Sequence, residues 1–86
     1  MKLKSNYVIK QVLDSNLLID INSNFDGVIK LNKTSKIICE CIQKNMKVSE
    51  IVDELSKKYN VDKKVLEKDV NDFINKMLSK GIFIND

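Results

Sequence analysis

Alternating apolar and polar positions in the first third of the chain predict three short strands. Residues 7–13 and 17–21 are rich in β-branched and other apolar side chains, as strands usually are. Turn-forming residues at 14–16 and 22–27 separate these two strands from each other and from a third over 28–31. Because each connection is short, the three strands are expected to form an antiparallel meander.

The period of two along each strand assigns its side chains to two faces. The inward set is expected to be Tyr7, Ile9, Leu13, Leu17, Ile19, Ile21, Ile29 and Leu31. The outward set is then Val8, Lys10, Val12, Leu18, Asp20, Val28 and Lys30. Four of these outward side chains are apolar, which is typical of a contact surface. Scattered exposure of apolar groups is also common on protein surfaces, so both interpretations stay open.

The remainder of the chain has the 3.6-residue period of three amphipathic helices. The first is capped by Asn32 and runs to about Lys44, and the second covers 48–59. The third covers 63–80 and ends at Gly81, a residue suited to the position just after a helix. With the three strands before them, these helices predict an α+β fold of the winged-helix-like kind, a three-stranded antiparallel sheet followed by three helices.

Each predicted helix has an apolar stripe that would face the core. Asp62 supplies a cap for the third helix, whereas Lys47 stands where a small polar cap would suit the second. Ile82-Phe83-Ile84 predict a short final strand or a packed tail. The expected stripes are Ile37, Ile38, Cys41 and Ile42; then Val48, Ile51, Val52, Leu55 and Tyr59; then Leu66, Val70, Phe73 and Met77, widened by Ile74 and Leu78.

The composition suits a single domain and contains no recognisable catalytic constellation. The chain has 86 residues, of which 43% are hydrophobic, and it has no histidine. Cys39 and Cys41 would point to nearly opposite faces of a helix, one into the core and one near the surface. They cannot hold one metal there, so we expect no metal site. Because the chain has no histidine and no recognisable catalytic arrangement, we also expect no cofactor and no enzyme activity. No apolar run approaches the ~20 residues of a membrane span, and we expect a cytoplasmic location without a membrane partner.

A winged-helix DNA-binding regulator is an alternative, because it has the same order of helices. The exposed side of its recognition helix would carry Lys64, Lys68, Asn71 and Asn75. However, the net charge of +3 arises in the first half, since residues 48–86 hold 7 lysines against 8 acidic residues. The chain also lacks arginine, the commonest reader of guanine. No nucleic-acid partner is therefore expected.

Four segments, in this order and spacing, resemble the PqqD-like family of precursor-peptide recognition elements, small peptide chaperones. They are Leu31-Asn32-Lys33-Thr34, Val48-Ser49-Glu50-Ile51-Val52, Asp69-Val70-Asn71-Asp72-Phe73-Ile74 and Leu78-Ser79-Lys80-Gly81-Ile82. The resemblance covers about residues 5–84. It departs from the family at Lys47, where a small polar cap is usual. It implies a protein that binds the leader of a ribosomally made precursor peptide and delivers it to a modifying enzyme, often a radical S-adenosylmethionine enzyme.

The resemblance also implies where the leader would lie, as an added strand beside the third strand and against the third helix. Val28, Ile29, Lys30 and Leu31 would then supply the edge that pairs with the peptide. The groove wall would be formed by Asn71, Ile74, Asn75 and Leu78. Ile74 and Leu78 also suit the core, and the two asparagines also suit a solvated helix surface. A free edge can pair with its own copy, so we expect a monomer or a weak homodimer.

Overall fold

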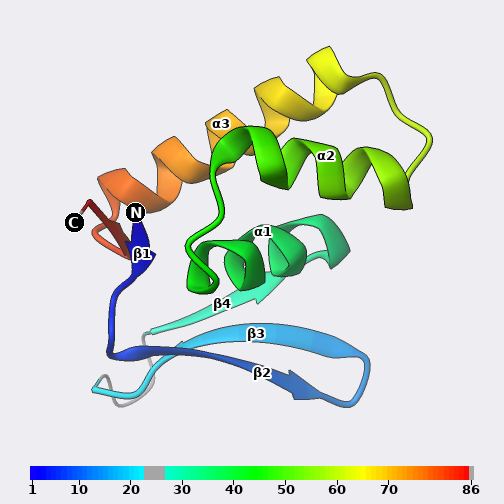
Figure 1. Cartoon of the computed structure of the whole chain (residues 1–86). Helices are drawn as coiled ribbons and strands as arrows, with labels where there is room; N and C mark the ends of the chain where they lie inside the picture. Colours follow the sequence, from blue (N-terminus) through cyan, green and yellow to red (C-terminus); the bar gives the residue numbers. More distant parts are fainter. Residues whose placement is uncertain (23–26, 86) are drawn as a thin grey trace.

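The chain folds as an α+β unit, which confirms the predicted fold class (Figure 1). The structure is a computed structural model and describes residues 1–22 and 27–85. The sheet of β2, β3 and β4 is antiparallel, and three helices follow it in the chain. The elements in order are β1 Lys2–Leu3, β2 Tyr7–Val12, β3 Ser15–Asp20, β4 Val28–Leu31, α1 Lys33–Gln43, α2 Val48–Lys58, α3 Lys63–Ser79 and β5 Phe83–Ile84.

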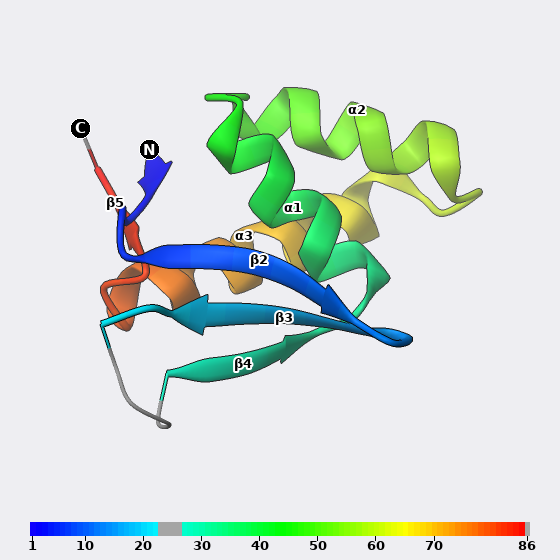
Figure 2. The same ribbon diagram turned by 90° about the horizontal axis from the view of Figure 1, so that it is seen from below.

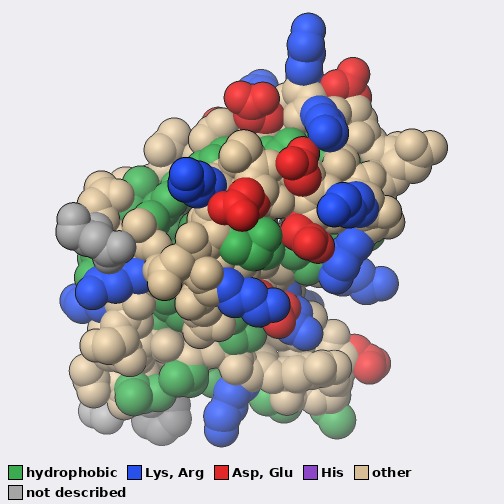
Figure 3. Space-filling view, in the orientation of Figure 1, with side chains coloured by type: hydrophobic (Ala, Val, Ile, Leu, Met, Phe, Trp, Pro, Cys, Tyr) green, Lys and Arg blue, Asp and Glu red, His purple; other side chains and the backbone are tan. Residues whose placement is uncertain are grey.

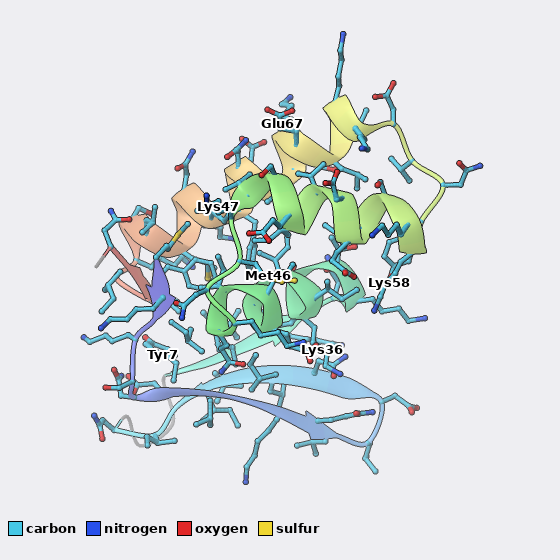
Figure 4. The ribbon with its side chains drawn as sticks, viewed as in Figure 1. Tyr7, Lys36, Met46, Lys47, Lys58 and Glu67 are labelled. Atoms are coloured by element: carbon cyan, nitrogen blue, oxygen red, sulfur yellow. The ribbon has the colours of Figure 1, made fainter. Side chains whose placement is uncertain are left out.

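All three helices lie on one side of the three-stranded sheet (Figures 1 and 2). Helix α1 lies directly over the sheet, and α2 packs on α1 and on α3. The core fills the space between these layers, and Tyr7 rises from β2 toward the helices to pack against it (Figure 4). The opposite face of the sheet is not covered by any element that the structure describes.

The first hairpin turn is shorter than the sequence indicates. Val12 pairs with Ser15, so that only Leu13 and Asp14 form the loop and Ser15 belongs to β3. Leu13 has a φ of 55° and is 91% exposed, so its predicted inward position is wrong. A two-residue hairpin loop favours such positive φ values, because its twist then matches that of the strands. Of the second predicted turn, residues 23–26 lie outside the described residues.

The tight hairpin reverses the predicted faces of β3. Leu18 pairs with Ile9 on one side and Ile29 on the other, and it is fully buried in the core. The predicted inward positions of Leu17 and Ile19 and the outward position of Leu18 are therefore wrong. The same correction turns Asp20 inward and Ile21 outward, where Ile21 is exposed. A shift of one residue moves every side chain of a strand to the other face. The faces predicted for 28–31 and for Tyr7 and Ile9 are confirmed.

The predicted helix starts are confirmed, each with its own capping contact. The Asn32 side-chain oxygen accepts a hydrogen bond from the Ser35 N–H at 2.7 Å. At α3, the Asp62 carboxylate accepts one from the Lys64 N–H at 2.8 Å. Lys47, which precedes α2, has no acceptor to offer, and instead its own N–H donates to the Glu50 carboxylate at 2.9 Å. A charge-assisted bond from the first turn thus replaces the missing polar cap.

Helices α1 and α3 end in the same way, with a left-handed residue after the C-cap. Gly81 has a φ of 73°, its N–H donates to the Leu78 carbonyl, and the Ile82 N–H donates to the Met77 carbonyl. Asn45, with a φ of 60°, occupies the equivalent position after α1. These paired bonds form the Schellman motif. Met46, the next residue, packs against the core between α1 and α2 (Figure 4).

The two ends of the chain form a small sheet of their own. Strand β5 confirms the predicted final strand, and it pairs antiparallel with β1, which was not predicted. Leu3 pairs with Phe83, and Phe83 is buried in the core. Because β1 has two residues only, no alternation marks it in the sequence. Strand β1 is recognised only by its pairing with β5 in the structure.

Candidate functional site

A groove of about 380 Å³ lies between β4 and α3, at the free side of the three-stranded sheet. Strand β4 is the last strand of the order β2-β3-β4, so one of its edges faces this space. Asn32 and Ser35, at the N-terminal end of α1, also line the groove. The lining residues are Ile29, Lys30, Leu31, Asn32, Ser35, Phe73, Lys76 and Met77.

The register of β4 determines which of its backbone groups are free. The Asp20 N–H donates to the Gly27 carbonyl at 2.7 Å, and Leu18 lies opposite Ile29. In an antiparallel pair, every second residue bonds to its neighbour and the residues between turn their N–H and C=O groups away. Ile29 therefore bonds to β3, whereas the backbone groups of Val28 and Lys30 point to the open edge. Within the described part of the chain, no strand pairs with that edge.

The walls of the groove are apolar at the base and positive at the rim. Ile29 and Phe73 are half-buried and pack against the core, and Met77 is buried. The Phe73 ring is held by an edge-to-face contact with Phe83. Lys30 and Lys76 are the charged side chains among the described residues of the lining, and none of these residues is acidic. An apolar side chain can therefore enter the groove, and a carboxylate can approach its rim.

The structure brings together one half of the predicted site. Ile29, Lys30 and Leu31 line the groove, and Val28 is next to them on the same strand, half exposed. The four predicted residues of α3 do not line this groove, because α3 turns a different side toward it. Ile74 is buried in the core, Leu78 packs against it, and Asn71 and Asn75 are exposed outside the groove.

The wall of the groove instead comes from Phe73, Lys76 and Met77. The sequence carried a signal for this side, since Phe73 and Met77 share the predicted core stripe and are one helical turn apart. An aromatic residue at the margin of such a stripe covers both core and surface. The signal did not suffice, because nothing in the sequence shows which margin of α3 faces β4.

Asn71 lies in a second depression of about 450 Å³, between α2 and α3. Its rim contains an ion pair between Lys63 Nζ and Asp53 Oδ1 at 3.0 Å. Both side chains of this pair are more than half exposed, so it contributes little to stability. Glu67, labelled on α3 in Figure 4, also lines this depression, which has no open strand edge.

The cysteines are not available for surface chemistry. Both Cys39 and Cys41 are buried, so the prediction of one near the surface is wrong. Helix α1 lies between the sheet and α2, and both of its sides are therefore covered. Burial, helped by the nearby Glu40, raises the pKa of Cys39 to about 12. Burial and then Glu54 also raise the pKa of Cys41. A thiol held neutral in this way is a poor nucleophile and a poor metal ligand.

Neither a metal cluster nor a membrane-spanning helix is found in the part of the chain that the structure describes. No three side chains of the metal-binding types come together among residues 1–22 and 27–85. The helices within those ranges are too short or too polar to cross a bilayer. The groove beside β4 is therefore the strongest candidate site. Its features define a small α+β module with an open sheet edge next to a helix, an arrangement suited to an extended peptide.

Comparison with known proteins identifies the family. Residues 17–82 match the family model described as Coenzyme PQQ synthesis protein D (PqqD), and the chain belongs to this family. No curated protein matches the chain significantly. The resemblance to PqqD-like proteins seen in the four sequence segments is thereby confirmed.

Two solved structures share the fold over nearly its whole length. One is TbiB1 in complex with the TbiA(beta) leader peptide, with a TM-score of 0.80 and 22% identity, covering 99% of this chain and 100% of that one. The other is lasso peptide synthetase B1 complexed with the leader peptide, with a TM-score of 0.83 and 18% identity, covering 98% and 96%. Neither comparison supports the winged-helix DNA-binding alternative.

Proposed function

We propose that this protein binds the leader segment of a ribosomally synthesised precursor peptide, as a strand added to β4. The observation that carries the proposal is the open edge of β4 beside an apolar groove with a positive rim. Two proteins of the same fold are known in complex with leader peptides, and this supports the same class of ligand here. Main-chain bonds to Val28 and Lys30 would provide affinity, and the groove would select side chains.

The added strand presents its side chains alternately to the two sides of the sheet. One set enters the groove, toward Ile29 and Phe73. The other set lies beside Val28 and Lys30. A carboxylate in the leader gains from Lys30 and Lys76, but at such exposed positions each pair contributes less than about 1 kcal/mol. Apolar contacts and backbone hydrogen bonds therefore contribute most of the binding free energy, and acidic residues of the leader add a small amount.

The bound leader would be presented to a modifying enzyme. A carrier that holds the substrate close to the enzyme raises the local substrate concentration without performing chemistry. The sequence resemblance implies a radical S-adenosylmethionine enzyme as this partner, and it is the first class to test. The protein acts as a binding component, with no cofactor of its own.

The first experiment is an affinity pull-down of the tagged protein from its native cells, reading peptides, proteins and nucleic acid together. The recovered peptide is then synthesised and its Kd measured by fluorescence anisotropy. Recovery of a short peptide with a larger enzyme supports the proposal. Recovery of salt-sensitive DNA without a peptide contradicts it.

Proline substitutions then test strand addition directly. Val28→Pro removes one outward-facing N–H of β4 and leaves the bonds of β4 to β3 in place. Gln11→Pro is the matched control, because by the same register its N–H faces the opposite edge of the sheet, on β2. Val28→Pro should weaken the peptide and Gln11→Pro should not. Equal affinity of a folded Val28→Pro protein would exclude pairing at β4.

A further inference from the structure

The sheet has a second exposed surface, on the side away from the helices (Figure 1). We name it the outer face, and by the observed register it consists of Val8, Lys10, Val12, Ser15, Leu17, Ile19, Val28 and Lys30. Val12 and Val28 are about half exposed, at 49% and 51%, and Val8, Leu17 and Ile19 are partly exposed. Figure 3 shows hydrophobic side chains along the lower rim of the molecule, where this sheet lies.

The charges of the outer face have one sign. Lys10 and Lys30 are its charged residues, and neither forms an ion pair with a described residue. The two acidic residues beside it along β2 and β3 are Asp20, which ends β3 on the helical side of the sheet, and Asp14, in the hairpin loop. In Figure 3, carboxylates instead gather over α2 and α3. An apolar surface with unpaired lysines is complementary to an apolar patch that has carboxylates beside it.

We propose that the outer face docks the modifying enzyme, through an apolar patch on the enzyme that is flanked by Asp or Glu side chains. This inference rests on the proposed function, since it concerns the partner to which the leader is presented. Contiguous apolar patches of this kind on a small domain mark interaction sites. The apolar base of the groove remains free when the outer face is covered, because Ile29, Phe73 and Met77 lie on the helical side of the sheet, and Lys30 alone borders both surfaces.

A second copy of the chain fits this face less well. An outer face packed on another outer face would place Lys10 and Lys30 of both copies in one contact. Like charges in such a contact are unfavourable, and the described residues of the outer face include no carboxylate to balance them. A partner with its own carboxylates is therefore the occupant that the charges favour.

The bound leader would extend the outer face. As a fourth strand beside β4, it would place every second side chain next to Val28 and Lys30 on this same surface. An enzyme docked there contacts the protein and the leader together. It follows that leader binding strengthens enzyme docking, and that the enzyme strengthens leader binding by the same factor.

The test begins with a photo-crosslinking benzoyl-phenylalanine in place of Leu17, in the full chain inside its native cells. The crosslinked enzyme is purified, and its Kd for this protein is measured by biolayer interferometry, with and without the synthetic leader. The variants Ile19→Thr and Lys10→Glu change the outer face. Threonine retains the β-branched shape that suits a strand. Val61→Thr and Lys68→Glu are the matched controls on the helical side.

We expect Ile19→Thr and Lys10→Glu to weaken enzyme binding by roughly tenfold each, as for central interface residues. Lys10→Glu should also reduce the salt dependence of binding. The controls should stay within about twofold. Leader affinity without enzyme should not change in any of the four variants. Crosslinks to a second copy only, no crosslinks at all, or unchanged enzyme affinity in both outer-face variants would overturn the proposal.

The outcome separates this inference from the proposed function. Leader affinity is measured without enzyme, and enzyme affinity is measured without leader. Loss of leader binding in Val28→Pro with no effect of Ile19→Thr on the enzyme would refute only the docking surface. If enzyme binding depended on Ile19 but the protein bound no leader, only the peptide-binding function would be refuted.

Discussion

The ring of Phe73 meets the ring of Phe83 edge to face, with centroids 6.0 Å apart and an interplanar angle of 76°. Phe73 belongs to α3 and lines the groove, whereas Phe83 belongs to β5 and is buried. The contact therefore joins the groove wall to the small sheet formed by the two chain ends. The geometry of the groove depends on that sheet.

Truncation of these rings should measure the coupling. Phe83→Ala should lower the free energy of unfolding by about 3–5 kcal/mol, as for other buried aromatic residues. Phe73→Ala should cost less, since its ring is only half-buried. In a double-mutant cycle by urea unfolding, the pair should show a coupling of about 0.5–1.5 kcal/mol. Additive effects of the two substitutions would contradict the contact.

The two Schellman motifs predict that removing a glycine from the left-handed position destabilises the fold, whereas introducing one there does not. Gly81→Ala should destabilise the fold by about 1–2 kcal/mol, because an L-residue is strained at positive φ. A Cβ at Gly81 would meet no atom within 4 Å, so the cost arises from the backbone alone. Asn45→Gly is the matched variant at the equivalent site, and it should be neutral or slightly stabilising. Thermal unfolding of both variants checks this, and an unchanged Gly81→Ala protein would argue against the motif.

Asp20 predicts an acid-dependent contribution to stability. Hydrogen bonds from the Asn6 side chain, at 2.7 Å, and the Asn22 N–H, at 2.9 Å, hold the pKa of Asp20 below its usual 3.8. A lowered folded-state pKa stabilises the fold fully above 3.8, and this gain is lost as the pH falls through the lowered value. Asp20→Asn should therefore be less stable than the parent at neutral pH. In chemical unfolding below the folded-state pKa, the difference should disappear, and a constant difference would contradict it.

The buried cysteines should resist thiol reagents. At neutral pH the raised pKa values of Cys39 and Cys41 leave almost no thiolate, and the core blocks access. Reaction with a chromogenic disulfide should be at least about a hundredfold slower in the native protein than in denaturant, where both thiols titrate normally. Cys39 should be slower than Cys41, which borders a surface depression. Cys39→Ser and Cys41→Ser assign the two phases, and rapid labelling of the native protein would contradict the packing of α1.

The positive rim predicts a moderate effect of charge on leader binding. Lys76→Glu should weaken an acidic leader by a few-fold, since each exposed pair is worth less than about 1 kcal/mol. The loss should shrink at high salt. Lys68→Glu, on the same helix but outside the groove lining, is the control and should leave the Kd unchanged. Equal losses in both variants would indicate a general charge effect in place of a specific rim.

The helices and β4 could be predicted from sequence because local chemistry defines their ends. Asn32, Asp62 and Gly81 each act within one turn of their own helix. Strand β3 could not be assigned correctly, since Leu17, Leu18 and Ile19 are all apolar and either face could be the buried one. The two-residue turn at Leu13 resolves the choice, and its conformation is not evident from the residue types.

The groove was predictable only in part for a related reason. Residues of β4 belong to an edge by their order in the chain, whereas the wall depends on how α3 is rotated about its axis. That rotation results from long-range packing, including the contact of Phe73 with Phe83. The burial of both cysteines also depends on tertiary structure, because α1 is covered from two sides.

The pairing of Lys2 with Ile84 brings the first and last described strands to one corner of the molecule (Figure 1). A polypeptide that enters and leaves a domain at one place can be spliced into a loop of a larger protein with little distortion of its host. A gene fusion could thus join this unit to either end of an enzyme or insert it into one of the enzyme's loops, and the unit would still fold as a separate domain attached at one point.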